Sequence, residues 1–255
     1  SNDGTIEVTA TVVEGSATVI EDSATGSSSA YVNAYGIYAP VMGEDGTISN
    51  DGTIEVTATV VEGSASGSSS ANVYASAYGI YAPNMGDGGA GGSISNDGTI
   101  EVTATATAEG SDADAIVYAY GIFVPDMGNG GEGGSISNEG SIEVTATVEG
   151  SASESGATVE ATAYGIYAES MGEDASFSND GTVEGSASGS GSSIINDGTI
   201  EVTATVEGSA NGSVSANVYA EAYGIYAENM DEDGTNSNNG TIDFTGMGED
   251  GTIKL

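Results

Sequence analysis

Apolar and polar residues alternate along a segment that recurs through the chain, first seen at residues 5–12. Its apolar positions are Ile6, Val8, Ala10 and Val12. Its polar positions are Thr5, Glu7, Thr9 and Thr11. A period of two places one set on each face of a half-buried strand. No apolar period of 3.6 residues is sustained anywhere, so the pattern predicts an all-β protein.

A tight bend precedes each of these strands, written as Asn-x-Gly. The Asn residues are Asn2, Asn50, Asn96, Asn138, Asn179, Asn196 and Asn238, separated by 48, 46, 42, 41, 17 and 42 residues. Gly suits such a bend because it adopts positive φ without strain. We expect the Asn side chains to stack as a structural ladder, with their amides hydrogen-bonded along the axis of the stack.

A second phrase, AYGIYA or a close variant, alternates with the first and places Gly at positions 36, 79, 121, 165 and 224. The gaps are 43, 42, 44 and 59 residues, and the last equals 42 plus the 17 residues of one unpaired unit at 178–194. This coincidence predicts a structural turn of roughly 17–24 residues, with the longer period as a pair of turns.

Self-similarity of this kind predicts one continuous right-handed parallel β-helix, or β-solenoid, over residues 1–255. Its two-turn repeats would start near residues 1, 49, 95, 137, 195 and 237, with the extra turn at 178–194. About a dozen turns, each rising by one strand spacing, would form a rod of roughly 60 Å.

Aromatic residues recur at two positions of the second phrase. One column would contain Tyr35, Tyr78, Tyr120, Tyr164 and Tyr223, and the other Tyr38, Tyr81, Phe123, Tyr167 and Tyr226. The two positions differ by three residues, so on a straight strand one column would lie in the core and the other on the surface. Packing explains both columns; an exposed tyrosine stripe binding a partner or carbohydrate is the alternative.

The polar face of the strands carries two further sets of recurring residues. The acidic set is Glu7, Glu55, Glu101, Glu143 and Glu201, with Asp243 in the last copy. With a two-turn repeat these carboxylates would lie about 10 Å apart, close to the screening length at physiological salt.

Thr-x-Thr pairs recur beside them, at Thr9/Thr11, Thr57/Thr59, Thr103/Thr105, Thr145/Thr147 and Thr203/Thr205. Outward Thr rows resemble the faces of ice-binding solenoids, but rows on every second turn, interrupted by Glu, make ice binding the weaker reading.

The charge of the chain restricts the classes of molecule that it can bind, because it has 39 acidic residues and one basic residue, Lys254. Nothing can neutralise phosphates, so neither nucleic acid nor an anionic membrane surface is expected as a partner. No apolar run approaches the ~20 residues of a membrane span. His and Cys are absent, so no nucleophile–base pair of the usual kinds can be assembled, and we expect no enzymatic activity.

Acidic Gly-rich loops supply the only candidate metal ligands, and no other cofactor is expected. Calcium takes several oxygen ligands from carboxylates and carbonyls. The candidates are Glu44, Asp45, Asp51, Glu173, Asp174, Asp180, Asp231, Glu232 and Asp233. They match neither an EF-hand nor the nonapeptide calcium repeat, and solvated acidic loops are the preferred interpretation, with calcium binding as the alternative.

The chain begins inside a bend and ends on a related phrase, so we expect uncapped ends that stack head to tail or continue a longer array. The phrases SNDGTIEVTA and AYGIYA resemble repeats in the passenger domains of autotransporter (type V secreted) adhesins, which are bacterial cell-surface β-helix proteins. The resemblance implies an extracellular location. Our hypothesis is a structural protein that forms a cell-surface fibre by end-to-end stacking of β-helices. An adhesin stalk that binds glycan or matrix through exposed Tyr or loops is the alternative.

Overall fold

The computed structural model consists of parallel β-strands. It describes residues 1–14, 27–42, 45–62, 70–85, 92–110, 112–132, 134–152, 158–168, 170–173, 176–179, 193–196, 199–210, 217–226, 235–238 and 241–247. Within this part of the chain, no helix is long and apolar enough to cross a membrane.

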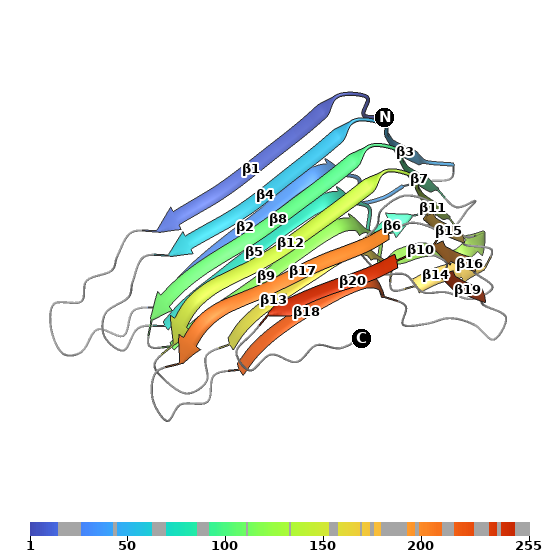
Figure 1. Ribbon diagram of the computed structural model, residues 1–255. Helices are drawn as coiled ribbons and strands as arrows, with labels where there is room; N and C mark the ends of the chain where they lie inside the picture. The colour runs from blue at the N-terminus through green and yellow to red at the C-terminus, as the bar shows by residue number, and fades with distance from the viewer. Residues whose placement is uncertain are drawn as a thin grey trace, which may run out of the picture.

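Two large sheets contain the long strands. The threonine sheet has the order β1 (Thr5–Glu14), β4 (Thr53–Glu62), β8 (Thr99–Gly110), β12 (Ser141–Ala152), β17 (Thr199–Ala210) and β20 (Thr241–Met247). The tyrosine sheet has the order β18 (Asn217–Tyr226), β13 (Thr158–Tyr167), β9 (Asp112–Phe123), β5 (Ser70–Tyr81) and β2 (Ser27–Tyr38). Figure 1 shows the threonine sheet as the front layer and the tyrosine sheet behind it.

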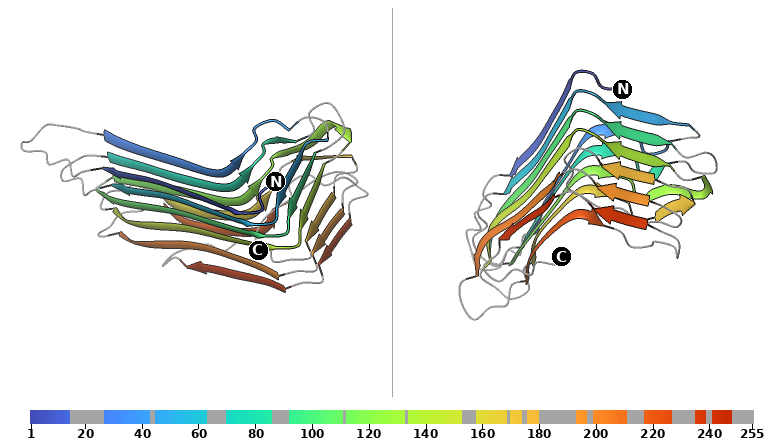
Figure 2. Two further views of the ribbon diagram at one scale, coloured as in Figure 1. Left: turned by 90° about the horizontal axis from the view of Figure 1, so that it is seen from above. Right: turned by 45° about the vertical axis from the view of Figure 1, so that its right-hand side comes forward.

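Two small sheets lie together at one end of these layers. The asparagine sheet has the order β19 (Thr235–Asn238), β16 (Ser193–Asn196), β15 (Ser176–Asn179), β11 (Ser135–Asn138), β7 (Ser93–Asn96) and β3 (Thr47–Asn50). The methionine sheet has the order β14 (Ser170–Glu173), β10 (Asp126–Glu132) and β6 (Asn84–Met85). Strands of the asparagine sheet lead through the bend into strands of the threonine sheet (Figure 2).

The second, third and fourth repeats each place one described strand in every sheet before the chain returns to the threonine sheet. Strand β1 pairs with β4 residue for residue, from Thr5↔Thr53 to Glu14↔Glu62. Bonded Asn side chains of consecutive repeats are 48, 46 and 42 residues apart in sequence. The repeat is therefore one circuit. The predictions of a two-turn repeat, of turns of 17–24 residues and of a dozen turns are wrong, because the two long strands of a repeat lie in different sheets.

The inserted unit at 178–194 adds a strand to one sheet. Asn179 in β15 pairs with Asn196 in β16, so β16 is an additional strand of the asparagine sheet. In the threonine sheet β12 pairs directly with β17. Residues 180–192 lie outside the described part of the chain.

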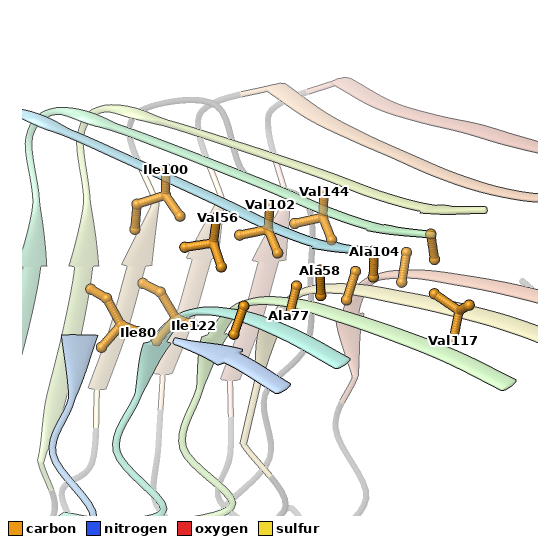
Figure 3. Close-up of a cluster of buried hydrophobic side chains, with 14 of the residues drawn as sticks. Val56, Ala58, Ala77, Ile80, Ile100, Val102, Ala104, Val117, Ile122 and Val144 are labelled. Carbon is orange, nitrogen blue, oxygen red and sulfur yellow. The ribbon is translucent and has the colours of Figure 1, made fainter. Parts of the chain in front are cut away.

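The core lies mainly between the two large sheets, and Met85, Ile94 and Ile136 of the small sheets also belong to it. From β4 it takes Ile54, Val56, Ala58 and Val60, all with 0% of their surface exposed. Figure 3 shows Val56, Val102 and Val144 of the threonine sheet above Ile80 and Ile122 of the tyrosine sheet. For β4, β8 and β12 the alternation thus predicts correctly which residues are buried. This all-β arrangement of parallel strands in register is compatible with a β-helix.

Candidate functional site

The Asn residues of the bends form one buried column. Each Nδ2 donates to the Oδ1 of the next Asn over 2.8, 2.6 and 2.5 Å, along Asn2, Asn50, Asn96 and Asn138. The last three have no exposed surface. The backbone of Asn179, Asn196 and Asn238 continues the column. The amides satisfy one another and carbonyls of the bend, so the column is a structural ladder.

Close approach to the preceding repeat requires Gly at the bends of Gly52, Gly98 and Gly140. A Cβ added at Gly98 would lie 1.9 Å from the carbonyl oxygen of Gly52, and one at Gly52 would lie 2.0 Å from that of Gly4. Neither glycine adopts a left-handed φ. The expected need for positive φ is therefore wrong, and the neighbouring repeat excludes any side chain at this position.

Both aromatic columns lie on the outer face of the tyrosine sheet. In the first, Tyr35, Tyr78, Tyr120 and Tyr164 stack with centroids 5.0, 4.9 and 4.9 Å apart. In the second, Tyr38, Tyr81, Phe123 and Tyr167 stack at 5.3, 5.3 and 5.1 Å. The columns touch edge to face, for example Tyr78 with Tyr81 at 5.1 Å. Tyr223 pairs with Tyr164 through its backbone, and its side chain lies outside the described residues.

The prediction that one column is buried is wrong because a Gly interrupts the alternation. Gly79 and Ile80 are consecutive and both face inward, so Tyr78 and Tyr81 emerge on the same side. A Cβ at Gly79 would lie 2.4 Å from Cγ2 of Ile100 on the opposite sheet. The AYGIY phrase therefore encodes an inward step of the backbone, which displaces the second aromatic residue to the surface.

Packing within the columns changes the acidity of the phenols. Burial raises the pKa of Tyr78 to about 12; repulsion from Tyr35 adds to this, and a hydrogen bond with Ser76 opposes it. Burial is also the main cause that raises the pKa of Tyr120, followed by repulsion from Tyr78 and Tyr164. These phenols stay protonated beyond the pH at which a free tyrosine ionises.

A third, shorter aromatic contact lies on the same face, outside the two columns expected from the sequence. Tyr31 and Tyr74 stack at 4.8 Å, four residues before the main column. The sequence indicates this contact, since Tyr occupies the same position in the first two repeats. The third repeat has Ile116 at that position, so the column ends there. Nearby, the hydroxyl of Tyr118 donates to Oε1 of Glu160 over 3.3 Å.

The recurring Glu residues are adjacent in space. Glu7 pairs with Glu55, and Glu101 pairs with both Glu55 and Glu143, so the carboxylates occupy one position on four neighbouring strands. All four are exposed. The expected spacing of about 10 Å is therefore wrong; adjacent strands are about 4.8 Å apart. Like charges at this spacing oppose one another directly.

Three of the calcium candidates belong to the described part of the chain, and they lie in different elements. Asp45 and Asp51 are exposed, Asp45 with a φ of 56°; Asp51 accepts a bond from Ser49 over 3.4 Å. Glu173 ends strand β14. The remaining candidates lie outside the described residues: Glu44, Asp174, Asp180, Asp231, Glu232 and Asp233. Among the described residues no three acidic side chains gather as a metal would require, and calcium binding stays a prediction.

The outer faces of the two large sheets therefore carry the chemistry that recurs in every repeat, as columns of Thr, Glu and aromatic side chains. Comparisons of the chain with protein-family models, with curated proteins and with solved structures find no match.

Proposed function

We propose that the chain is a structural segment of an extracellular, cell-surface fibre, built as a right-handed β-solenoid whose repeats continue end to end. Pairing of like with like supports this, because each repeat presents to the next the residues that it receives from the previous one. Such an array extends by adding further identical units.

The observation that carries the proposal is the open edge at β1. The inward side chains of this edge strand, Ile6, Val8, Ala10 and Val12, are only partly buried. Their counterparts one strand further in are fully buried. A further repeat would bury this apolar edge and pair its backbone, whether it comes from a second copy or from the same protein.

The net charge of −38 acts on the sides of the rod. Repulsion between acidic surfaces disfavours lateral association and keeps the rods soluble. Contact at the β1 edge would bring apolar and hydrogen-bonding groups together, so axial association can exceed this repulsion. The location at a cell surface rests on the resemblance of the repeats to autotransporter passenger domains.

Gly4→Ala tests the proposal, because Gly4 differs from the other bend glycines. A Cβ at Gly4 meets nothing within 4 Å, whereas the same change at Gly52 would strike the carbonyl of Gly4. The variant should therefore keep the stability of the monomer yet block addition of a further repeat at β1. Asp3→Asn, exposed in the same bend, is the matched control.

Negative-stain microscopy of the purified chain should show filaments that lengthen with protein concentration. They should shorten to single rods in Gly4→Ala and persist in Asp3→Asn. Discrete rods in the unsubstituted chain at every concentration would contradict end-to-end assembly.

An adhesive role for the aromatic columns has narrower support. Tyr31 and Tyr38 of β2 are 62% and 60% exposed, as a contact surface requires. Sugars stack on ring faces, however, and within the columns each face is covered by the next ring. A glycan array should therefore give signals that depend on the edge residue Tyr38; the absence of any signal would count against adhesion to glycans.

A further inference from the structure

The outward Thr residues form a continuous two-dimensional array. Because the repeat is a single circuit, their columns pass through neighbouring strands of the threonine sheet, from β1 to β17. One column contains Thr9, Thr57, Thr103 and Thr145, and the second contains Thr11, Thr59, Thr105 and Thr147. We name these eight residues the threonine lattice. The backbone pairing extends it to Thr203, Thr205 and Thr245.

The lattice is regular in both directions. Neighbouring strands are about 4.8 Å apart, and outward residues along one strand follow at roughly 6.6 Å. Every position holds the same β-branched side chain, whose χ1 angle has few options on a strand. Among the described strands no other sheet covers this face, which forms the front layer in Figure 1. Hydroxyl and methyl groups are therefore repeated at one fixed spacing across the strands and at another along each strand.

The chemistry of the lattice suits ordered water. Each Thr hydroxyl offers one donor and two acceptor positions. Its methyl group restricts the orientations of first-shell water. Both spacings are similar to repeats of the water oxygens in an ice crystal, so water held above the lattice would already resemble an ice plane.

The charged columns lie beside the lattice. The acidic column of Glu7, Glu55, Glu101 and Glu143 occupies the neighbouring outward position. Between Thr9 and Thr11 the intervening residue, Ala10, points inward. The array thus has two uninterrupted Thr columns. The two features that made ice binding the weaker reading of the sequence, Thr rows on every second turn and interruption by Glu, therefore do not apply to these two columns.

We propose that the threonine lattice is an ice-binding surface whose partner is the face of an ice crystal. The proposal is independent of the fibre, since a single rod already presents the complete lattice. Stacking would only lengthen it.

Ice activity of the purified chain tests the proposal directly. The protein should hold a freezing point below the melting point and shape the crystals, and fluorescently labelled protein should coat an ice surface. The double variant Thr57→Lys/Thr103→Lys places long charged side chains in the centre of the lattice and should abolish the freezing gap. Asn33→Lys, exposed on the outer face of the tyrosine sheet, should retain it.

Circular dichroism melts establish that each variant is folded. If the Lys variant does not fold, Thr103→Tyr replaces it, because Tyr favours strands and still obstructs a flat ice contact. Absence of a freezing gap in the unsubstituted chain would overturn the proposal. So would a folded lattice variant that keeps full activity, or binding to crystalline cellulose or chitin without binding to ice.

Discussion

At the scale of single residues, Asn96 connects three consecutive repeats. It accepts a bond from Asn50 over 2.6 Å and donates to Asn138 over 2.5 Å, with none of its surface exposed. Replacement by Ala removes both bonds, while Asn50 Nδ2 still lies 3.3 Å from the carbonyl oxygen of Thr99. Each lost hydrogen bond contributes about 0.5–1.5 kcal/mol to stability. Asn96→Ala should therefore lower the urea midpoint strongly.

Ser95→Ala is the control for this change, because Ser95 is the outward neighbour on the same strand. Its midpoint should stay close to that of the unsubstituted chain. Equal stability of the two variants would mean that the ladder contributes nothing beyond its neighbours.

The bend glycines give a second comparison at this scale. Gly98→Ala would bring Cβ to within 1.9 Å of the Gly52 carbonyl, whereas Gly4→Ala meets no atom within 4 Å. Overpacking costs typically about 1–3 kcal/mol. Urea unfolding should show that loss for Gly98→Ala and almost none for Gly4→Ala. A similar loss in both would point to backbone conformation as the reason for Gly.

Sequence alone identifies these bend residues, because Asn and Gly recur at fixed positions. It does not reveal why Gly is needed. Positive φ and close approach both select Gly. The position of the neighbouring repeat separates the two explanations, and that repeat is distant in sequence: Asn50 and Asn96, for example, are 46 residues apart.

At the scale of elements, the tyrosine sheet should be sensitive to alkali. The pKa of Tyr78 rises from 10.0 to about 12 on folding, chiefly through burial. Below pH 10 both states are protonated and the contribution to stability is complete. Between pH 10 and 12 the unfolded chain loses its proton first, so up to about 3 kcal/mol is lost with rising pH.

Tyr78→Phe removes this titration and keeps the ring, as Phe123 does in the adjacent column. The alkaline unfolding midpoint, followed by circular dichroism, should therefore move to higher pH in the variant. An unchanged midpoint would show that Tyr78 ionises equally in both states.

In the acidic column, removal of one carboxylate should raise the stability of the fold. Glu101 lies directly between Glu55 and Glu143 on adjacent strands. Like charges directly opposite one another destabilise a sheet. Glu101→Gln should raise the melting temperature in low salt, and the gain should shrink as salt screens the column. A gain that is independent of salt would indicate a cause other than charge.

Sequence reasoning identified the strands correctly but not how they stack. Alternation fixes the buried face of β4, because side-chain direction depends only on the period of two. It does not reveal that Gly79 and Ile80 both face inward, because that step depends on contact with Ile100 of the opposite sheet. The positions of the aromatic columns follow from this contact.

At the scale of the molecule, the central consequence is that one repeat equals one circuit. Gap counting alone leaves open whether two long strands of a repeat lie in one sheet or in two. The strand pairing decides it, since IEVTATV pairs only with its own copies and AYGIY with its own. Every column of identical side chains is consequently continuous, which makes possible both the ladder of Asn and the lattice of Thr.

Deletion of one whole repeat tests this architecture most directly. Removing residues 97–138 joins Asn96 to Glu139 and restores an Asn-x-Gly bend, so β4 can pair with β12 as it did with β8. The product should fold cooperatively and form a rod shorter by about 4.8 Å in small-angle scattering. Removing residues 97–117 deletes a strand of the threonine sheet but keeps the AYGIF phrase, so the sheets lose register and folding should fail. A shorter deletion that folds as well as the longer one would show that half a repeat is already a complete circuit.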